Sequence, residues 1–170
     1  LVIRQQPEHS RMCGVGAKAD RRPIDPPPVV ELKLNNPMVP NDKSYLFNPY
    51  LFMYVCLVAV DTNEEVHLLP DRKTRATTGS TVSSLFHIRD HENKEGAFFV
   101  FADMSVRVEG TYRLKFMLYE LIADRVQFLK SIESKPFKVY SAKAFPGMSD
   151  STELSKAFAE QGLKIRIRKD

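Results

Sequence analysis

The chain has 170 residues, 43% of them hydrophobic and 27% charged, with a formal net charge of +4. This size and composition fit one domain with a real core. The longest apolar run, 51–60, has ten residues, too few for a membrane span, which needs roughly 18. Cys13 and Cys56 lie far apart and no Asn-x-Ser/Thr sequon is present, so we expect a reducing, intracellular setting. Because the chain opens on Leu-Val-Ile, we expect a domain excised from a longer protein.

The chain reads as a series of short strands separated by turn residues. Alternating or β-branched apolar runs predict strands over 1–6, 29–34, 50–60, 66–69, 81–88, 97–101, 110–122, 126–132 and 137–140. The run 50–60 is apolar throughout, which is typical of a strand buried on both faces. In 110–122, Tyr112, Leu114, Phe116 and Leu118 share one face.

The segment 11–28 stands out among the connections. It holds two glycines, four prolines, one lysine and three arginines. Glycine permits unusual backbone angles, and proline fixes φ and removes a donor. The segment therefore predicts a stiff, irregular loop that presents cationic side chains. The connection 71–80 is also polar and basic, and its Arg72, Lys73 and Arg75 form a weaker cluster.

One helix is expected near the C-terminus. Asp150 is a candidate N-cap with Glu153 as its capping-box partner, and Gly162 fits the position after the last turn. The end of the chain then predicts a last strand that points Leu163, Ile165 and Ile167 inward. In that strand Lys164, Arg166 and Arg168 point outward.

These elements predict a single domain, 1–170, of the all-β class with one C-terminal helix. Many short strands with turn punctuation favour an antiparallel β-sandwich. An α/β fold would need helices between the strands, and the sequence shows none.

No motif predicts catalysis. Gly14-Val-Gly16 runs into Arg-Arg-Pro instead of a helix with a Gly-Lys-Ser/Thr signature. His87 and His91 have helical spacing, but their segment reads as a strand end and turn. Cys13 has no evident base partner. We therefore expect no enzyme, no cofactor and no metal site.

Two basic features remain, and each has two interpretations. The first is Arg11, Lys18, Arg21 and Arg22 in the N-terminal segment, and the second is the C-terminal row Lys164, Arg166 and Arg168. Concentrated cations suit the phosphate backbone of nucleic acid. Lysine and arginine also protect exposed strand edges, so composition alone leaves both readings open.

Specific residues resemble a known family. Ile3-Arg-Gln-Gln-Pro, Arg11-Met-Cys-Gly-Val-Gly-Ala-Lys and Asp20-Arg-Arg-Pro-Ile-Asp-Pro-Pro-Pro closely resemble the opening of velvet domains. Phe145-Pro-Gly-Met-Ser, the run 151–162 and Lys164-Ile-Arg-Ile-Arg-Lys resemble their close. Velvet proteins are fungal regulators of development, sporulation and secondary metabolism.

The resemblance implies an immunoglobulin-like β-sandwich related to the Rel-homology domain of the nuclear factor kappa B proteins. It also implies sequence-specific binding of double-stranded DNA by a nuclear transcriptional regulator, present also in the cytoplasm. Dimers with itself or with other velvet proteins are implied as well, without membrane association. The family's DNA contacts map onto Lys18, Arg21 and Arg22; Arg11, Lys164, Arg166 and Arg168 are added on charge grounds.

The alternative is a protein-interaction module without DNA binding of its own. Met117 and Tyr119, or the helix face beyond Leu154 and Phe158, would then meet a partner, although all four equally fit an ordinary core. A sandwich that binds carbohydrate or lipid is a third possibility, but the chain has no Trp and no recognisable ligand-pocket signature.

Overall fold

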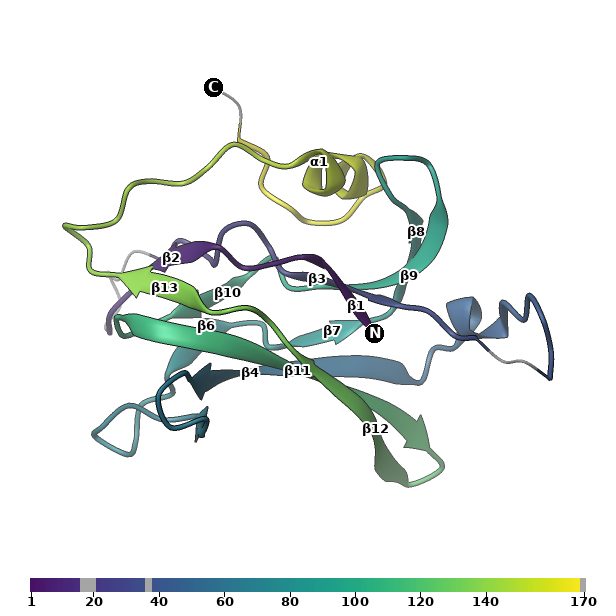
Figure 1. Cartoon of the computed structure of the whole chain (residues 1–170), viewed down its shortest axis with the longest axis horizontal. Helices are drawn as coiled ribbons and strands as arrows, with labels where there is room; N and C mark the ends of the chain where they lie inside the picture. Colours follow the sequence, from purple (N-terminus) through teal and green to yellow (C-terminus); the bar gives the residue numbers. More distant parts are fainter. Residues whose placement is uncertain (16–20, 36–37, 169–170) are drawn as a thin grey trace.

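Two β-sheets pack face to face in this protein, as Figure 1 shows for a computed structural model that describes residues 1–15, 21–35 and 38–168. The smaller sheet has the order β1 (Val2–Gln5), β3 (Val29–Leu32), β9 (Glu95–Val100), β8 (Phe86–Arg89). The larger sheet has the order β2 (His9–Arg11), β13 (Phe137–Tyr140), β11 (Gly110–Ile122), β4 (Leu51–Ala59), β5 (Glu65–Val66). Beside this path, β12 (Arg125–Glu133) pairs with β11, and β7 (Val82–Ser84) pairs with β4.

The main core fills the space between the sheets. Val30 and Phe99 of the smaller sheet belong to the same buried cluster as Met53, Leu114 and Phe116 of the larger one. The prediction of an all-β sandwich is therefore confirmed. One detail differs, because β2 runs parallel to β13, so the larger sheet is mixed instead of purely antiparallel.

The central strands follow the predicted alternation. In β11, Tyr112, Leu114, Phe116 and Leu118 are buried, whereas Arg113 and Lys115 between them are half-buried. The prediction that β4 is buried on both faces is wrong for its first half. Phe52 and Tyr54 are only half-buried, because no element among the described residues covers that end of the outer face of the larger sheet.

Two expectations about strands need correction. The run 81–88 is two strands, β7 and β8, which lie in different sheets, because the chain crosses from one layer to the other between them. The connection 71–80 contains β6 (Thr77–Gly79), and a further short strand, β10 (Met104–Val106), pairs with it. Both are three residues long, too short to show a period. The connection between β3 and β4 holds a short 3-10 helix, η1 (Ser44–Phe47).

The C-terminal helix α1 (Glu153–Glu160) lies against the smaller sheet and carries its own core, with Phe158 packed on Phe98 at 4.9 Å between ring centroids. Its N-cap is Thr152, not Asp150: the Ser155 amide donates to Thr152 Oγ1 at 3.0 Å. Gly162 follows the helix with a φ of +102°, as predicted for the stop. In the described residues, no helix is both long and apolar enough to cross a membrane.

The last residues, 163–168, do not form the predicted strand. Their backbone bonds within the tail and to the segment before α1 instead: the Ile165 amide donates to the Leu163 carbonyl at 2.9 Å, and the Arg168 amide donates to Ser151 Oγ at 2.7 Å. The side-chain alternation survives, since Ile165 is buried while Lys164 and Arg166 are exposed. An extended tail can therefore present the expected row without a sheet partner.

An ion cluster fixes the turn between β8 and β9. Arg4 donates to Glu31 Oε1 at 2.7 Å and to Asp90 Oδ2 at 3.0 Å. Burial disfavours the charged form of Asp90, but hydrogen bonds from the Lys94 amide, Arg4 and the Glu92 amide outweigh it and lower its pKa below the ordinary value. The turn is thereby held to the edge of β1 and β3.

Candidate nucleic-acid interface

The basic N-terminal segment leaves β2 and returns along β10, which holds it at both ends. The Cys13 amide donates to a β10 carbonyl at 2.9 Å, and the Ile24 amide donates to another at 2.8 Å. Between them, Ser105 Oγ of β10 lies 3.3 Å from the Arg21 carbonyl oxygen and 3.1 Å from that of Arg22. The backbone that carries the two arginines is therefore anchored to the sandwich.

A further arginine supports the other side of this segment. Arg107, directly after β10, donates from Nη1 to the Gly14 carbonyl at 2.9 Å and is half-buried. Sequence reasoning missed Arg107 because it is a single basic residue between two apolar segments. The structure assigns it a supporting place at the base of the segment.

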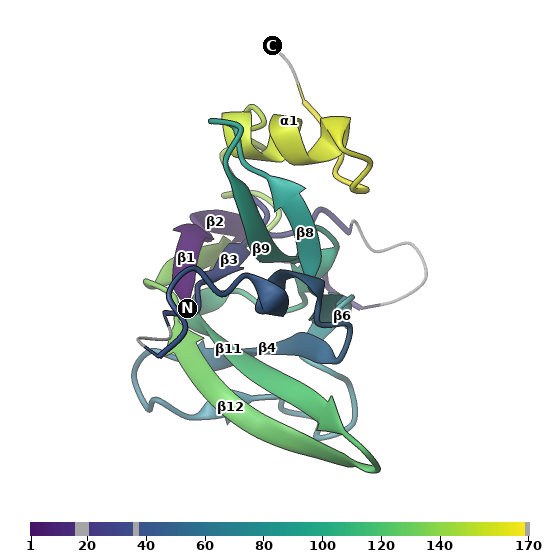
Figure 2. The same cartoon turned by 90° about the vertical axis from the view of Figure 1, so that its right-hand side faces the viewer.

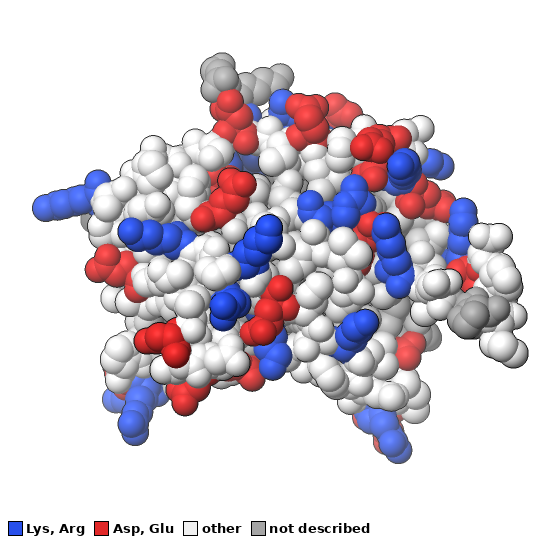
Figure 3. Space-filling model, in the orientation of Figure 1, with Lys and Arg blue, Asp and Glu red and all other residues white. Residues whose placement is uncertain are grey.

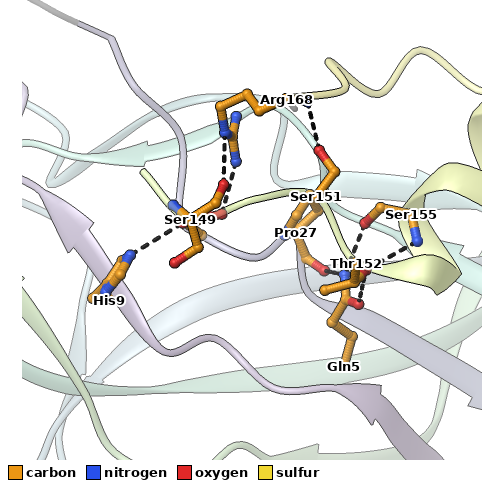
Figure 4. A network of polar contacts seen from close by, with 9 residues as sticks. Gln5, His9, Pro27, Ser149, Ser151, Thr152, Ser155 and Arg168 are labelled. Carbon is orange, nitrogen blue, oxygen red and sulfur yellow. Dashed lines mark hydrogen bonds and ion pairs between the residues drawn. The ribbon is translucent and has the colours of Figure 1, made fainter. Parts of the chain in front are cut away.

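Asp25 joins the N-terminal segment to the C-terminal tail. Its carboxylate is 1% exposed and accepts from Arg168 Nη2 at 2.8 Å and from the Ser149 amide at 2.7 Å. His9 Nε2 lies 3.0 Å from the same carboxylate. A buried carboxylate needs such partners because an unpaired charge is costly to bury. Figure 4 shows Arg168, Ser149 and His9, which come from three segments, lying close together.

Two more contacts hold the tail, one within the C-terminal segment and one to the body of the molecule. Arg168 Nε donates to the Ser149 carbonyl at 3.0 Å. Buried Gln5 of β1 donates to the Pro27 carbonyl at 2.8 Å and accepts from Thr152 Oγ1 at 2.6 Å, so one side chain links loop end and helix cap (Figure 4). These contacts bring the two ends of the chain together, although 143 positions separate Asp25 and Arg168.

A basic depression results where the two segments meet. It has a volume of about 400 Å³ and is lined by Arg21, Arg22, Pro23, Met148, Arg166 and Arg168. Arg21, Arg22 and Arg166 are exposed. Neither Arg21 nor Arg166 forms an ion pair with any residue that the structure describes. Arg168 is different, because its guanidinium is engaged by Asp25 and serves first to hold the tail.

The other predicted site residues do not line this depression. Arg11 is half-buried in β2, where it pairs with Tyr140. Lys164 lies on a different groove, beside β8. Lys18 falls outside the described residues. The structure thus joins the N-terminal pair to Arg166 and Arg168, and separates Lys164 from them.

Charge is mixed on one broad face of the molecule. On the face seen in Figure 3, lysine and arginine alternate with aspartate and glutamate, and neither sign dominates. A weak overall charge of +4 therefore cannot by itself hold a polyanion there, and binding would depend on local clusters.

The two thiols are poorly suited to nucleophilic chemistry. Burial, together with a hydrogen bond to Glu65, raises the pKa of Cys56 to about 12, so this thiol stays protonated at neutral pH. Cys13 is buried as well. Among the described residues, no group of three His, Cys, Asp or Glu side chains is placed to hold a metal ion.

The fold and this depression define an all-β sandwich whose two chain ends close into one basic surface. The chain belongs to the velvet family: the Velvet factor family model matches residues 1–75 and 69–170. It is 47% identical to the spore development regulator umv1 of Mycosarcoma maydis and 40% identical to the spore development regulator VOSA of Pyricularia oryzae. It is 37% identical to the developmental and secondary metabolism regulator veA of Aspergillus fumigatus.

These similarities cover nearly all of this chain but only part of each relative. The alignments include 99% of the chain for umv1 and 100% for VOSA and veA. They cover 26%, 33% and 35% of those three proteins, respectively. The family is shown by the shared domain, and its named members are regulators of spore development and secondary metabolism.

Proposed function

We propose that this domain binds double-stranded DNA sequence-specifically, as part of a nuclear regulator of transcription in spore development and secondary metabolism. The observation that carries the proposal is the convergence of Arg21, Arg22 and Arg166 on one depression with an anchored backbone. Guanidinium groups bind phosphate oxygens bidentately and can also read guanine O6 and N7. The role is regulatory and non-enzymatic, as the names of the relatives suggest.

Anchoring matters to this proposal because an ordered surface loses less entropy on binding. The Arg21 and Arg22 carbonyls accept from Ser105, and Arg166 lies between the tied positions 165 and 168 of the tail. The arginine side chains still have to order, but the backbone beneath them does not. Phosphate contacts at such a surface set the register of the duplex, and base contacts then supply specificity.

Selection from a pool of random duplexes at physiological salt tests the proposal. We expect a recurring short motif to be enriched, with an affinity that falls as salt rises. The slope of log affinity against log salt should be about −0.9 for each phosphate neutralised. Neither an enriched motif nor a salt-dependent affinity is expected of a pure protein-interaction module, so failure of both would refute DNA binding.

We also propose that the domain dimerises, with itself or with another velvet domain, through the outer face of the larger sheet. An aromatic row crosses this face: Phe52 stacks on Tyr119 at 5.6 Å, and Tyr119 meets Phe128 edge-on at 5.7 Å. Leu121 and Val126 beside it are exposed. An uncharged row of this kind can bury itself against a copy related by a two-fold axis.

Phe128→Asp should weaken this dimer. Phe128 is 52% exposed, so a charge there costs the monomer little, whereas burying it in an interface costs about 2 kcal/mol or more, roughly 30-fold in affinity. Analytical ultracentrifugation measures the change. Val39→Asp, at a side chain 50% exposed on the loop before β4, is the matched control and should leave the dimer intact. Equal effects of both variants would contradict this interface.

A further inference from the structure

The outer edge of β8 carries backbone groups that face a groove instead of another strand. Because β8 is the last strand of the smaller sheet, it pairs only with β9. In an antiparallel pair, the residues of a strand alternately direct their N–H and C=O toward the neighbour and away from it. The side to which the N–H and C=O groups of each β8 residue point therefore follows from one residue whose hydrogen-bond partners are known.

Arg89 is that residue. Its amide donates to Gln161 Oε1 at 2.8 Å, and its carbonyl accepts from Gln161 Nε2 at 2.6 Å. Both backbone groups of Arg89 thus point away from β9, and the carboxamide of Gln161 occupies them as an added strand would. By alternation along the unbroken register 86–89, His87 also points both backbone groups outward.

The space beyond His87 is a groove whose lining is largely apolar, with a few polar side chains. It lies between β7 and β8 on one side and the tail 161–165 on the other, and has a volume of about 650 Å³, within the range of ligand clefts. Figure 2 shows β8 at the edge of its sheet, beneath α1. The apolar side chains that line the groove include Phe86, Ile88, Ala102, Leu163 and Ile165.

We propose that this groove binds an extended peptide segment, which adds a strand to the edge of β8. The peptide backbone would pair with His87, the next residue of β8 whose N–H and C=O point outward, while Gln161 continues to bond Arg89. Side chains alternate across a strand, so every second residue of the peptide would face Phe86 and Leu163 and should be apolar. Lys164, an exposed residue of the lining, has no ion pair within the described part of the chain, which favours an acidic peptide residue near Lys164 and away from Asp103, the acidic residue of the same lining.

Contacts with neighbouring elements hold β8 in place. The Arg4–Asp90 contact fixes the turn at one end of β8, and His87 Nε2 contacts Glu95 Oε2 at 2.8 Å on the adjacent strand. The strand is therefore ordered before any peptide arrives. Main-chain pairing to an ordered edge gives affinity, and the alternate side-chain positions give selectivity. This inference is independent of DNA binding, because the groove and the basic depression share no lining residue.

A display library of random nine-residue peptides, selected on this chain, supplies the probe. We expect enrichment of peptides with alternating apolar residues, and the synthetic peptide is then titrated by fluorescence anisotropy. His87→Pro removes the outward N–H without breaking a bond to β9, whereas His87→Ala keeps that N–H and loses the same imidazole. Proline is tolerated at sheet edges for this reason.

The comparison of the two variants decides the matter. We expect His87→Ala to bind the selected peptide as the native chain does, within about twofold, and His87→Pro to bind at least tenfold more weakly. A smaller difference between them, or no enriched peptide, would overturn the proposal. If His87→Pro unfolds, as circular dichroism would show, hydrogen exchange in the native chain replaces it: slower exchange of the His87 amide on binding supports strand addition, and unchanged exchange refutes it.

Discussion

Replacing Lys18, Arg21 and Arg22 together with alanine is expected to abolish duplex binding and leave the fold intact. Arg21 and Arg22 are exposed, and their backbone carbonyls, not their side chains, accept the bonds from Ser105. Truncation therefore removes positive charge and leaves the bonds from Ser105 to the backbone in place. Each arginine that contacts a phosphate or base edge contributes about 1–3 kcal/mol, so the triple change should weaken binding at least 100-fold, measurable by gel shift.

A second basic triplet offers a control with the same loss of charge. Arg72, Lys73 and Arg75 are exposed on the connection between β5 and β6 and lie outside the depression. Their replacement by alanine should lower non-specific attraction slightly and leave the selected motif bound. If the first triple variant is well folded and binds like the native chain, the N-terminal segment is not the DNA-binding surface.

Arg166→Ala tests whether the tail shares in the same surface. Its side chain lines the depression with Arg21 and Arg22, so its loss should weaken binding of all sequences alike and reduce the salt slope by about one. Lys164→Ala should have no comparable effect, because Lys164 lies on the β8 groove. Equal losses from both changes would favour the row of outward cations that the sequence alone predicts.

Asp25→Ala is expected to destabilise the domain by about 3–5 kcal/mol, the usual cost of leaving buried charged partners uncompensated. The carboxylate is 1% exposed and accepts from Arg168 and from the Ser149 amide. Its loss would leave the Arg168 guanidinium without its carboxylate partner and release the tail from the N-terminal segment. Urea unfolding followed by circular dichroism measures the change.

Two further variants sharpen this result. Asp124→Ala, at an exposed position in the turn between β11 and β12, should change stability by less than about 0.5 kcal/mol. Asp25→Asn keeps the shape and one acceptor oxygen, and so should fall between the two. If Asp25→Ala costs no more than Asp124→Ala, the contacts of Asp25 do not hold the chain ends together.

Much of the fold follows from local patterns. The bounds of β11 and β13 are those predicted, because alternation over 110–122 and the break at Pro136 are visible in the chain itself. Short strands such as β6 and β10 were missed, since three residues carry no period. The helix cap is Thr152 instead of Asp150, although the capping bond from the Ser155 amide is local; the same hydroxyl also donates to Gln5, which no local pattern shows.

The candidate site, like the fold, has parts that the sequence predicts and parts that depend on the tertiary structure. The charged side chains and the alternating strands can be read from the sequence, and the velvet resemblance identifies the segment that matters most. Tertiary structure alone decided that Arg21 and Arg22 meet Arg166 and that Lys164 faces another groove. The physical reason is that alternation is a local property of the backbone, whereas the meeting of the chain ends depends on Asp25. Its buried carboxylate must find partners, and it finds Arg168 at the other end of the chain.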